Sequence, residues 1–339
     1  MCPRVCLKSP MNQRSFFHSF PRPRGESPAD LTAKSLGILR LVMEVGLVLA
    51  PETVAWRLPQ VDGTDREIVV ESCRICFTEL TEAELPAHSE RFGAFALEFQ
   101  IDTLRRMGAL PVIYMPQAVR ADRGPSSVGS MIVAMMSHAR YLLGQLENLR
   151  RNTDLEWVTA NYGGVTGIQD DAVFNLNNTD DSGAIADAYQ VPIRAVRDLL
   201  AFIGYKNAPF DLLFNTLGFV ENLFYPTDDQ VHDEVLAYYR QREWRLTPGL
   251  TVDGSTLGRE LTEEEKIKVL ATSSDFWSRE IKRGEAMVRR VDAARVIDRI
   301  GGRPVHEQIS SIIVPDEDLK RASEVVDGRV AIRVLDSAG

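Results

Sequence analysis

Hydrophobic residues recur with helical spacing between residues 31 and 43, which predicts an amphipathic helix. The positions on its apolar stripe are Leu31, Leu36, Leu39, Val42 and Met43. Ser27 is a helix-capping residue type, and Pro28 suits the first helical position. Gly46 supplies a left-handed stop. The pattern therefore predicts a helix from about residue 28 to residue 45 that packs on a core.

Several short segments are rich in β-branched and aromatic residues, which is typical of strands. In residues 95–99 the alternation places Phe95, Leu97 and Phe99 on one face, so that face is expected to be buried. The predicted strands are residues 68–77, 95–99, 110–115, 243–246, 309–314 and 329–335.

The middle of the chain has helical periodicity instead, in residues 131–149, 192–203, 210–223 and 230–239. Residues 161–181 are rich in Gly, Asn and Asp, which predicts a loop. Residues 263–300 are charged and are predicted to be helical.

This order of elements predicts an α+β fold with a mixed, mostly antiparallel β core. We expect a single domain over residues 14–339, with a helical insertion at about residues 126–240. Residues 1–13 are expected to form a flexible tail, and Met11 is a credible alternative start.

The net charge of -9 and the pI near 5.2 argue against nucleic acid as the main partner, because neutralising phosphates needs a basic face. The longest apolar run, residues 128–143, is interrupted by Ser137, His138 and Arg140, so no membrane span is predicted. The N-terminus lacks the apolar stretch of a secretory signal. Four cysteines in 339 residues favour a reducing, cytoplasmic compartment.

Cys73 and Cys76 form a single CxxC pattern without a second pair at zinc spacing, so no metal site is predicted. Strand alternation would place them on opposite faces as two small buried hydrophobic residues. The common signatures of nucleotide-binding loops, zinc proteases and esterases are absent from the sequence.

Polar Thr78, His88 and Ser89 stand where a predicted strand ends and a connection begins, a usual place for binding sites. The alternative is that His88 makes one structural hydrogen bond, as lone histidines often do.

Three motifs follow one another in this region. They are Cys76-Phe77-Thr78-Glu79, then His88-Ser89-Glu90-Arg91-Phe92-Gly93-Ala94-Phe95, then Pro111-Val112-Ile113-Tyr114. In order and spacing they resemble the AbiGi family of abortive phage-resistance proteins. The resemblance implies a role in phage defence, commonly as an antitoxin whose partner is a toxin or a phage-derived protein.

The wider layout resembles a minimal ADP-ribosyltransferase, with a histidine on the first strand and a glutamate on a late strand. The resemblance implies NAD as substrate, His18 as a catalytic residue that seats the nucleotide, and Glu243 as the catalytic carboxylate. It implies NAD-binding roles for Ser19, Thr78, His88, Ser89 and Arg245. The usual first motif is His-Phe-Thr, whereas this chain has His18-Ser19-Phe20, so the hydroxyl stands one place early.

In the strand at residues 243–246, alternation points Glu243 and Arg245 one way and Trp244 the other. Glu243 could then face a polar cleft, or form an ion pair on a surface strand. Two hypotheses for the function therefore remain, an NAD-consuming enzyme and a non-catalytic antitoxin that binds a partner. The sequence does not decide the oligomeric state.

Overall fold

The computed structural model describes residues 15–59, 65–115, 128–153, 173–179, 185–192, 195, 210–227, 242–249, 251–252, 255–283 and 286–335. The predicted tail, the helix predicted at residues 230–239 and most of the helix predicted at residues 192–203 lie outside these residues. Contacts divide the chain into two compact units, residues 1–131 with 222–339, and residues 132–221.

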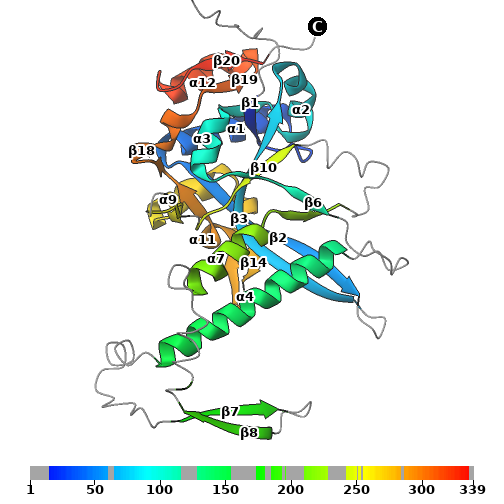
Figure 1. Cartoon of the computed structure of the whole chain (residues 1–339). Coiled ribbons are helices and arrows are strands. Elements are labelled where there is room, and N and C mark those ends of the chain that lie inside the picture. The colour runs from blue at the N-terminus through cyan, green and yellow to red at the C-terminus, as the bar shows by residue number, and fades with distance from the viewer. Residues whose placement is uncertain are drawn as a thin grey trace, which may run out of the picture. The chain divides into compact units, whose positions relative to one another are not determined.

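The first unit is built on a ten-stranded sheet, whose main path runs β13-β16-β2-β3-β1-β4-β19-β20, with β10 bridging β3 and β5 (Figure 1). Its strands are antiparallel except for the parallel pair β19–β20, which confirms a mixed, mostly antiparallel α+β fold. The strands are β1 (Ser15–Phe20), β2 (Leu47–Pro59), β3 (Asp65–Leu80), β4 (Phe95–Phe99), β5 (Leu110–Pro111), β10 (Glu243–Leu246), β13 (Arg259–Glu260), β16 (Arg295–Ile297), β19 (Ser311–Val314) and β20 (Ile332–Val334).

The helices of this unit are α1 (Pro28–Glu44), α2 (Leu85–Phe92), α3 (Ile101–Met107), α9 (Glu263–Thr272), α10 (Ser274–Trp277), α11 (Arg290–Ala293) and α12 (Leu319–Val326). Short two-stranded pairs complete it, namely β6 (Ile113–Met115) with β9 (Phe224–Pro226), β11 (Thr251–Val252) with β12 (Ser255–Thr256), β14 (Glu280–Arg283) with β15 (Ala286–Arg289), and β17 (Arg299–Ile300) with β18 (Arg303–Pro304).

Helix α1 forms as the sequence predicts. The Ser27 hydroxyl accepts a hydrogen bond from the Asp30 N–H at 3.2 Å, which caps the first turn. Gly46 ends the helix region with φ of 127°, and a Cβ there would collide with the Ile297 carbonyl. Glycine is therefore required both by its backbone conformation and by the close approach of β16 at Ile297.

The main core lies between the sheet and helices α1, α3 and α12. It contains Leu39 of α1, Phe77 of β3, Leu97 of β4 and Val326 of α12, all nearly inaccessible to solvent. Burying a side chain of this size contributes about 1.5–3 kcal/mol. Five consecutive residues of β4 are buried, so this strand is covered on both faces rather than on the single face that the alternation predicts.

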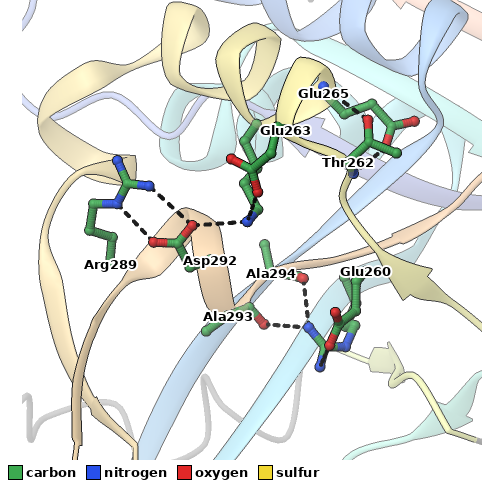
Figure 2. A network of polar contacts seen from close by, with 10 residues as sticks. Glu260, Thr262, Glu263, Glu265, Arg289, Asp292, Ala293 and Ala294 are labelled. Carbon is green, nitrogen blue, oxygen red and sulfur yellow. Dashed lines mark hydrogen bonds and ion pairs between the residues drawn. The ribbon is translucent and has the colours of Figure 1, made fainter.

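A second, smaller core holds α9, α10 and α11 against β2 and β16. Figure 2 shows the polar contacts made by residues of α9, α11 and the segments next to them. Helix α9 begins with a reciprocal cap, in which Thr262 accepts from the Glu265 N–H at 3.3 Å and Glu265 accepts from the Thr262 N–H at 2.8 Å. Asp292 accepts from Arg289 at 2.8 Å and pairs with Lys266 at 3.1 Å. The Lys266–Asp292 ion pair thus joins α9 to α11.

Residues 263–300 were predicted to be one helical stretch, and beyond Trp277 this prediction holds only for the short helix α11. Glu280–Arg283 and Ala286–Arg289 pair as an antiparallel hairpin, and Arg295–Ile297 joins the large sheet. Charged residues suit the exposed hairpin as well as an exposed helix, so composition could not separate the two.

The second unit contains most of α4 (Val128–Thr153), the hairpin β7 (Val173–Thr179) with β8 (Ile185–Pro192), and α7 (Phe210–Glu221). It lies within the predicted insertion, yet part of it is β-structure. The prediction of a loop is wrong for β7, because this strand pairs with β8 although three of its residues are asparagine. The carboxylate of Glu221 is buried and accepts hydrogen bonds from Ser137 and Arg140.

Among the described residues, no helix combines the length and the apolar character that crossing a membrane requires.

Candidate active site

A cleft of about 770 Å³ opens on the first unit, and strands β1, β2, β3 and β10 supply its floor. The register explains its position. Strand β2 pairs with β3 up to Arg74, and β1 pairs with β3 from Thr78, so β3 changes its partner within these residues. The cleft is lined by residues of all three strands around this change of partner.

Glu243 lies on β10 at the cleft with both carboxylate oxygens bonded. Arg245 Nε donates to Oε1 at 2.8 Å, and the Tyr114 hydroxyl donates to Oε2 at 2.7 Å. The Cys76 thiol supplies a further hydrogen bond to the same carboxylate. On the opposite face of β10, Trp244 packs edge-to-face on Phe16 with ring centroids 5.2 Å apart. The predicted alternation of this strand is therefore confirmed.

The electrostatics keep Glu243 ionised. Burial by itself raises the pKa of this carboxyl, but the charge of Arg245 and the hydrogen bonds from Cys76, Tyr114 and Arg245 together bring the pKa below its usual value. Arg245 is 2% exposed, and the nearby Glu243 charge raises its pKa against the opposing effect of burial. A buried pair like this is stable because each charge has several hydrogen-bond partners.

Cys76 and Tyr114, the other two hydrogen-bond donors to Glu243, stay protonated. Burial, and next the negative charge of Glu243, raise the pKa of the Cys76 thiol and of the Tyr114 hydroxyl. A protonated thiol is a poor nucleophile, so Cys76 acts here as a hydrogen-bond donor. Cys73, three residues earlier, points elsewhere and donates to the Ala293 carbonyl at 3.0 Å. The two cysteines are thus in separate environments, as the strand alternation predicts.

His18 on β1 lines the same cleft. Its Nδ1 lies 2.9 Å from the Cys76 carbonyl, which can only accept, so Nδ1 carries the proton. Burial lowers the pKa of His18, which keeps the ring neutral at pH 7. Nε2 is then a lone-pair nitrogen that can accept a hydrogen bond from a ligand hydroxyl. No proton transfer by this ring is needed for such a role.

Ser19 and Thr78 also line the cleft. Thr78 lies directly opposite Glu243 in the β3–β10 register and opposite Phe17 in the β1–β3 register. Strand β3 continues to Leu80, so Thr78 lies inside the strand. The prediction that Thr78 stands at a strand end is therefore wrong. The Ser19 hydroxyl is buried without a hydrogen-bond partner in the described structure, so it has an unused donor and acceptor.

His88 and Ser89 lie on helix α2, which corrects the prediction that they belong to a connection at a strand end. His88 lines the cleft and stacks on Phe92 with centroids 4.4 Å apart. Burial, followed by the charges of Arg22 and His18, lowers the pKa of His88 to about 4. Ser89 is outside the cleft lining, and its hydroxyl donates to the Pro86 carbonyl within the helix.

Residues from β6 and β9, which pair in parallel, form an aromatic wall of the cleft. Tyr114 and Tyr225 meet edge-to-face with centroids 6.1 Å apart. The guanidiniums of Arg245 and Arg74 lie 4.8 and 5.9 Å from the Tyr225 ring centroid. Arg74 is in turn paired with Glu52 at 2.5 Å, so its charge is balanced inside the cleft.

The structure thus brings together Glu243, His18, Ser19, Thr78, His88 and Arg245, and leaves Ser89 aside. Sequence reasoning assigned no role to Cys76, Tyr114 or Tyr225. A signal existed for the first two, because both stand in the motifs that carry the AbiGi resemblance. Tyr225 lies in none of these motifs, and its place follows from the pairing of β6 with β9.

The described residues contain no group of three or more His, Cys, Asp or Glu side chains that could hold a metal ion. No family model matches the chain, and neither the curated proteins nor the solved structures compared with it give a match. The AbiGi and ADP-ribosyltransferase resemblances therefore remain predictions.

Proposed function

We propose that this chain is a phage-defence protein of the AbiGi type whose cleft binds NAD and cleaves the bond between nicotinamide and ribose. The observation that supports the proposal is the arrangement of an ionised, triply hydrogen-bonded Glu243 and a neutral His18 in one cleft. These two residues are far apart in the chain, and strands β1 and β10 bring each of them beside β3.

The chemistry fits these residue types. Breaking the nicotinamide–ribose bond develops positive charge on the ribose, and a carboxylate fixed in a partly dry cleft stabilises that charge without having to reorient. Tyr114, Arg245 and Cys76 hold the carboxylate in place. His18 Nε2 would accept from a ribose hydroxyl, and the unpartnered Ser19 hydroxyl would provide a neighbouring contact.

Nicotinamide release from NAD by the purified chain tests the proposal. Glu243→Gln preserves the size of the side chain and removes the charge, and its single amide oxygen can accept from only one of the two donors Arg245 and Tyr114. We expect release to fall at least a hundredfold, the scale on which loss of one transition-state stabilising group acts. Glu317→Gln, at an exposed carboxylate in the short turn before α12, is the matched control and should retain full release.

A wild-type protein that releases no nicotinamide, or a Glu243→Gln variant as fast as wild type, would contradict the catalytic proposal. Circular dichroism and thermal unfolding of both variants would show whether a loss of release reflects unfolding instead.

One observation favours the second candidate, a non-catalytic antitoxin that binds a toxin or a phage-derived protein. Arg245 Nε lies 2.8 Å from Glu243 Oε1, so its positive charge offsets the negative charge of the carboxylate. A carboxylate paired with a cation exerts a weaker field on a ligand than an unpaired carboxylate does. This candidate predicts no NAD turnover and a stable complex with the product of a neighbouring gene. Co-expression of the two, followed by size-exclusion chromatography, is the direct measurement.

A further inference from the structure

Two arginines lie over the ring of Phe276, a residue of α10 that lines the cleft. The guanidinium of Arg290 lies 4.2 Å from the ring centroid of Phe276, and that of Arg24 lies 5.5 Å from it. A third arginine, Arg279, lines the cleft together with Arg24, whereas Arg290 is not part of the lining. Stacking on an aromatic ring holds a guanidinium in a fixed orientation and leaves its N–H groups available at the ring edge.

The backbone holds these arginines together. Arg279 and Arg290 flank the β14–β15 hairpin, and the Arg290 N–H donates to the Arg279 carbonyl at 2.9 Å. Arg290 also donates from its guanidinium to the Phe276 carbonyl at 3.5 Å. Arg24 arrives from the connection between β1 and α1. The cluster therefore combines the base of the β14–β15 hairpin with the connection between β1 and α1.

The cleft lining also contains the carboxylates of Glu26, Glu52 and Asp275, of which Glu26 pairs with Lys34 and Glu52 with Arg74. Among the described residues, Arg24, Arg279 and Arg290 form no ion pair with a carboxylate, and Nε of Arg290 is buried without a hydrogen-bond partner. Burial, followed by the positive charges of Arg279 and Arg24, lowers the pKa of Arg290, with Glu52 acting in the opposite direction. Two other cations of the cleft are paired, Lys34 with Glu26 at 2.7 Å and Arg74 with Glu52.

We infer that Arg24 and Arg279, with the positive charge of Arg290 beside Phe276 close to them, form a binding site for a phosphomonoester dianion carried by the nucleotide in the cleft. The cleft would then select a dinucleotide with an additional phosphate, such as NADP, over NAD. This inference rests on the proposed function for the nucleotide as ligand, and it adds the class of nucleotide that is preferred.

The charge of the ligand group decides between the kinds of phosphate. Each phosphate of a pyrophosphate bridge carries a single negative charge, whereas a phosphomonoester carries about 1.5 to 2 at neutral pH and offers three oxygens. Three like charges held close together repel one another, and a dianion relieves that repulsion better than a monoanion does. Planar guanidinium groups also match phosphate oxygens with paired hydrogen bonds. A long nucleic acid is disfavoured, because the chain has a net charge of -9.

Binding of non-cleavable fragments tests the inference apart from catalysis. Adenosine 2′,5′-bisphosphate carries the added phosphate, and AMP lacks it. By isothermal titration calorimetry at low salt, we expect the bisphosphate to bind at least tenfold more tightly, the scale of one charge-assisted contact. Arg279→Ala should reduce this ratio at least fivefold. Arg303→Ala, which removes an exposed arginine outside the cleft lining, should leave both affinities unchanged.

A second arm uses the whole dinucleotides and separates the two proposals. If NAD is cleaved and NADP binds no better than NAD, the phosphate site is wrong and the proposed function stands. If NADP and the bisphosphate bind preferentially but no nicotinamide is released, the phosphate site stands and the proposed catalysis is wrong. Equal affinities for bisphosphate and AMP, or an undiminished ratio in both Arg279→Ala and Arg24→Ala, overturn the inference.

Discussion

Tyr114 and Glu243 are 129 residues apart in the chain, and the Tyr114 hydroxyl donates a 2.7 Å hydrogen bond to Glu243 Oε2. The contact depends on two strand pairings at once. Strand β10 pairs with β3 and β5, and β5 is followed directly by β6, which carries Tyr114. Tyr114 precedes the second unit in the sequence and Glu243 follows it. The candidate catalytic carboxylate is therefore oriented by a residue from the other segment of the first unit.

Tyr114→Phe tests how much this contact contributes. Hydrogen bonds to charged groups contribute about 1.5–3 kcal/mol, so we expect the free energy of unfolding to fall by about that amount. The pKa of Glu243 should rise, because one of the groups that lower it is lost. Urea unfolding measures the first effect. Tyr141→Phe, at an exposed tyrosine on α4, is the control, and an equal loss in both variants would contradict a specific role for Tyr114.

The stability of the fold should depend on the protonation of His88. Its pKa is about 4 in the folded chain and near 6.5 when unperturbed. The unfolded chain therefore binds more protons between these values, and stability falls as the pH drops from about 6.5 towards 4. The loss approaches about 1.4 kcal/mol for each unit of pKa difference, and His18, whose pKa is also lowered, adds to it.

Urea unfolding at pH 7, 6 and 5 measures this dependence. His88→Gln removes the titrating ring, so its stability should change less over this range than that of the wild type. Glu84 and Glu265, with pKa values of about 2, lose their contribution only as the pH falls below their unperturbed value near 4.5, so they leave the upper part of the range unaffected. Parallel slopes in wild type and variant would refute the assignment to His88.

Gly93→Ala should destabilise the fold strongly. Gly93 has φ of 115°, and a Cβ would collide with the Phe20 and Pro21 carbonyls where α2 meets β1. The backbone strain costs about 1–2 kcal/mol, and the collision adds to it. Gly25→Ala is a matched control, because its φ of 91° is also strained but its surroundings are open within 4 Å. The difference in thermal unfolding between the two variants isolates the collision, and equal effects would exclude it.

This collision gives a physical reason for one motif residue. In the segment His88-Ser89-Glu90-Arg91-Phe92-Gly93, the glycine allows the end of α2 to touch the backbone of β1, which places His88 and Phe92 at the cleft. Similarly, Cys76 and Tyr114 come from the other two motifs and both bond to Glu243. The motif residues therefore share one location, although the motifs are separate in sequence.

The sequence by itself determined the local features whose causes are local. The Ser27 cap, the positive φ at Gly46 and the alternation in β10 depend on neighbours within a few residues, and the structure confirms all three, whereas the close contact of Gly46 with Ile297 is long-range. It also determined the α+β class. Composition alone could not separate hairpin from helix in residues 280–289, or strand from loop in β7, because polar residues are compatible with both states.

Only the tertiary structure decided which side chains meet. Whether Glu243 faces solvent or a cleft depends on which strand lies beside β10, and strand pairing is a long-range choice that no local pattern encodes. The same holds for the convergence of Tyr114, Arg245 and Cys76 on one carboxylate, and for the arginines beside Phe276. Their hydrogen bonds and charges act over a few ångströms, so they exist only after distant segments have packed together.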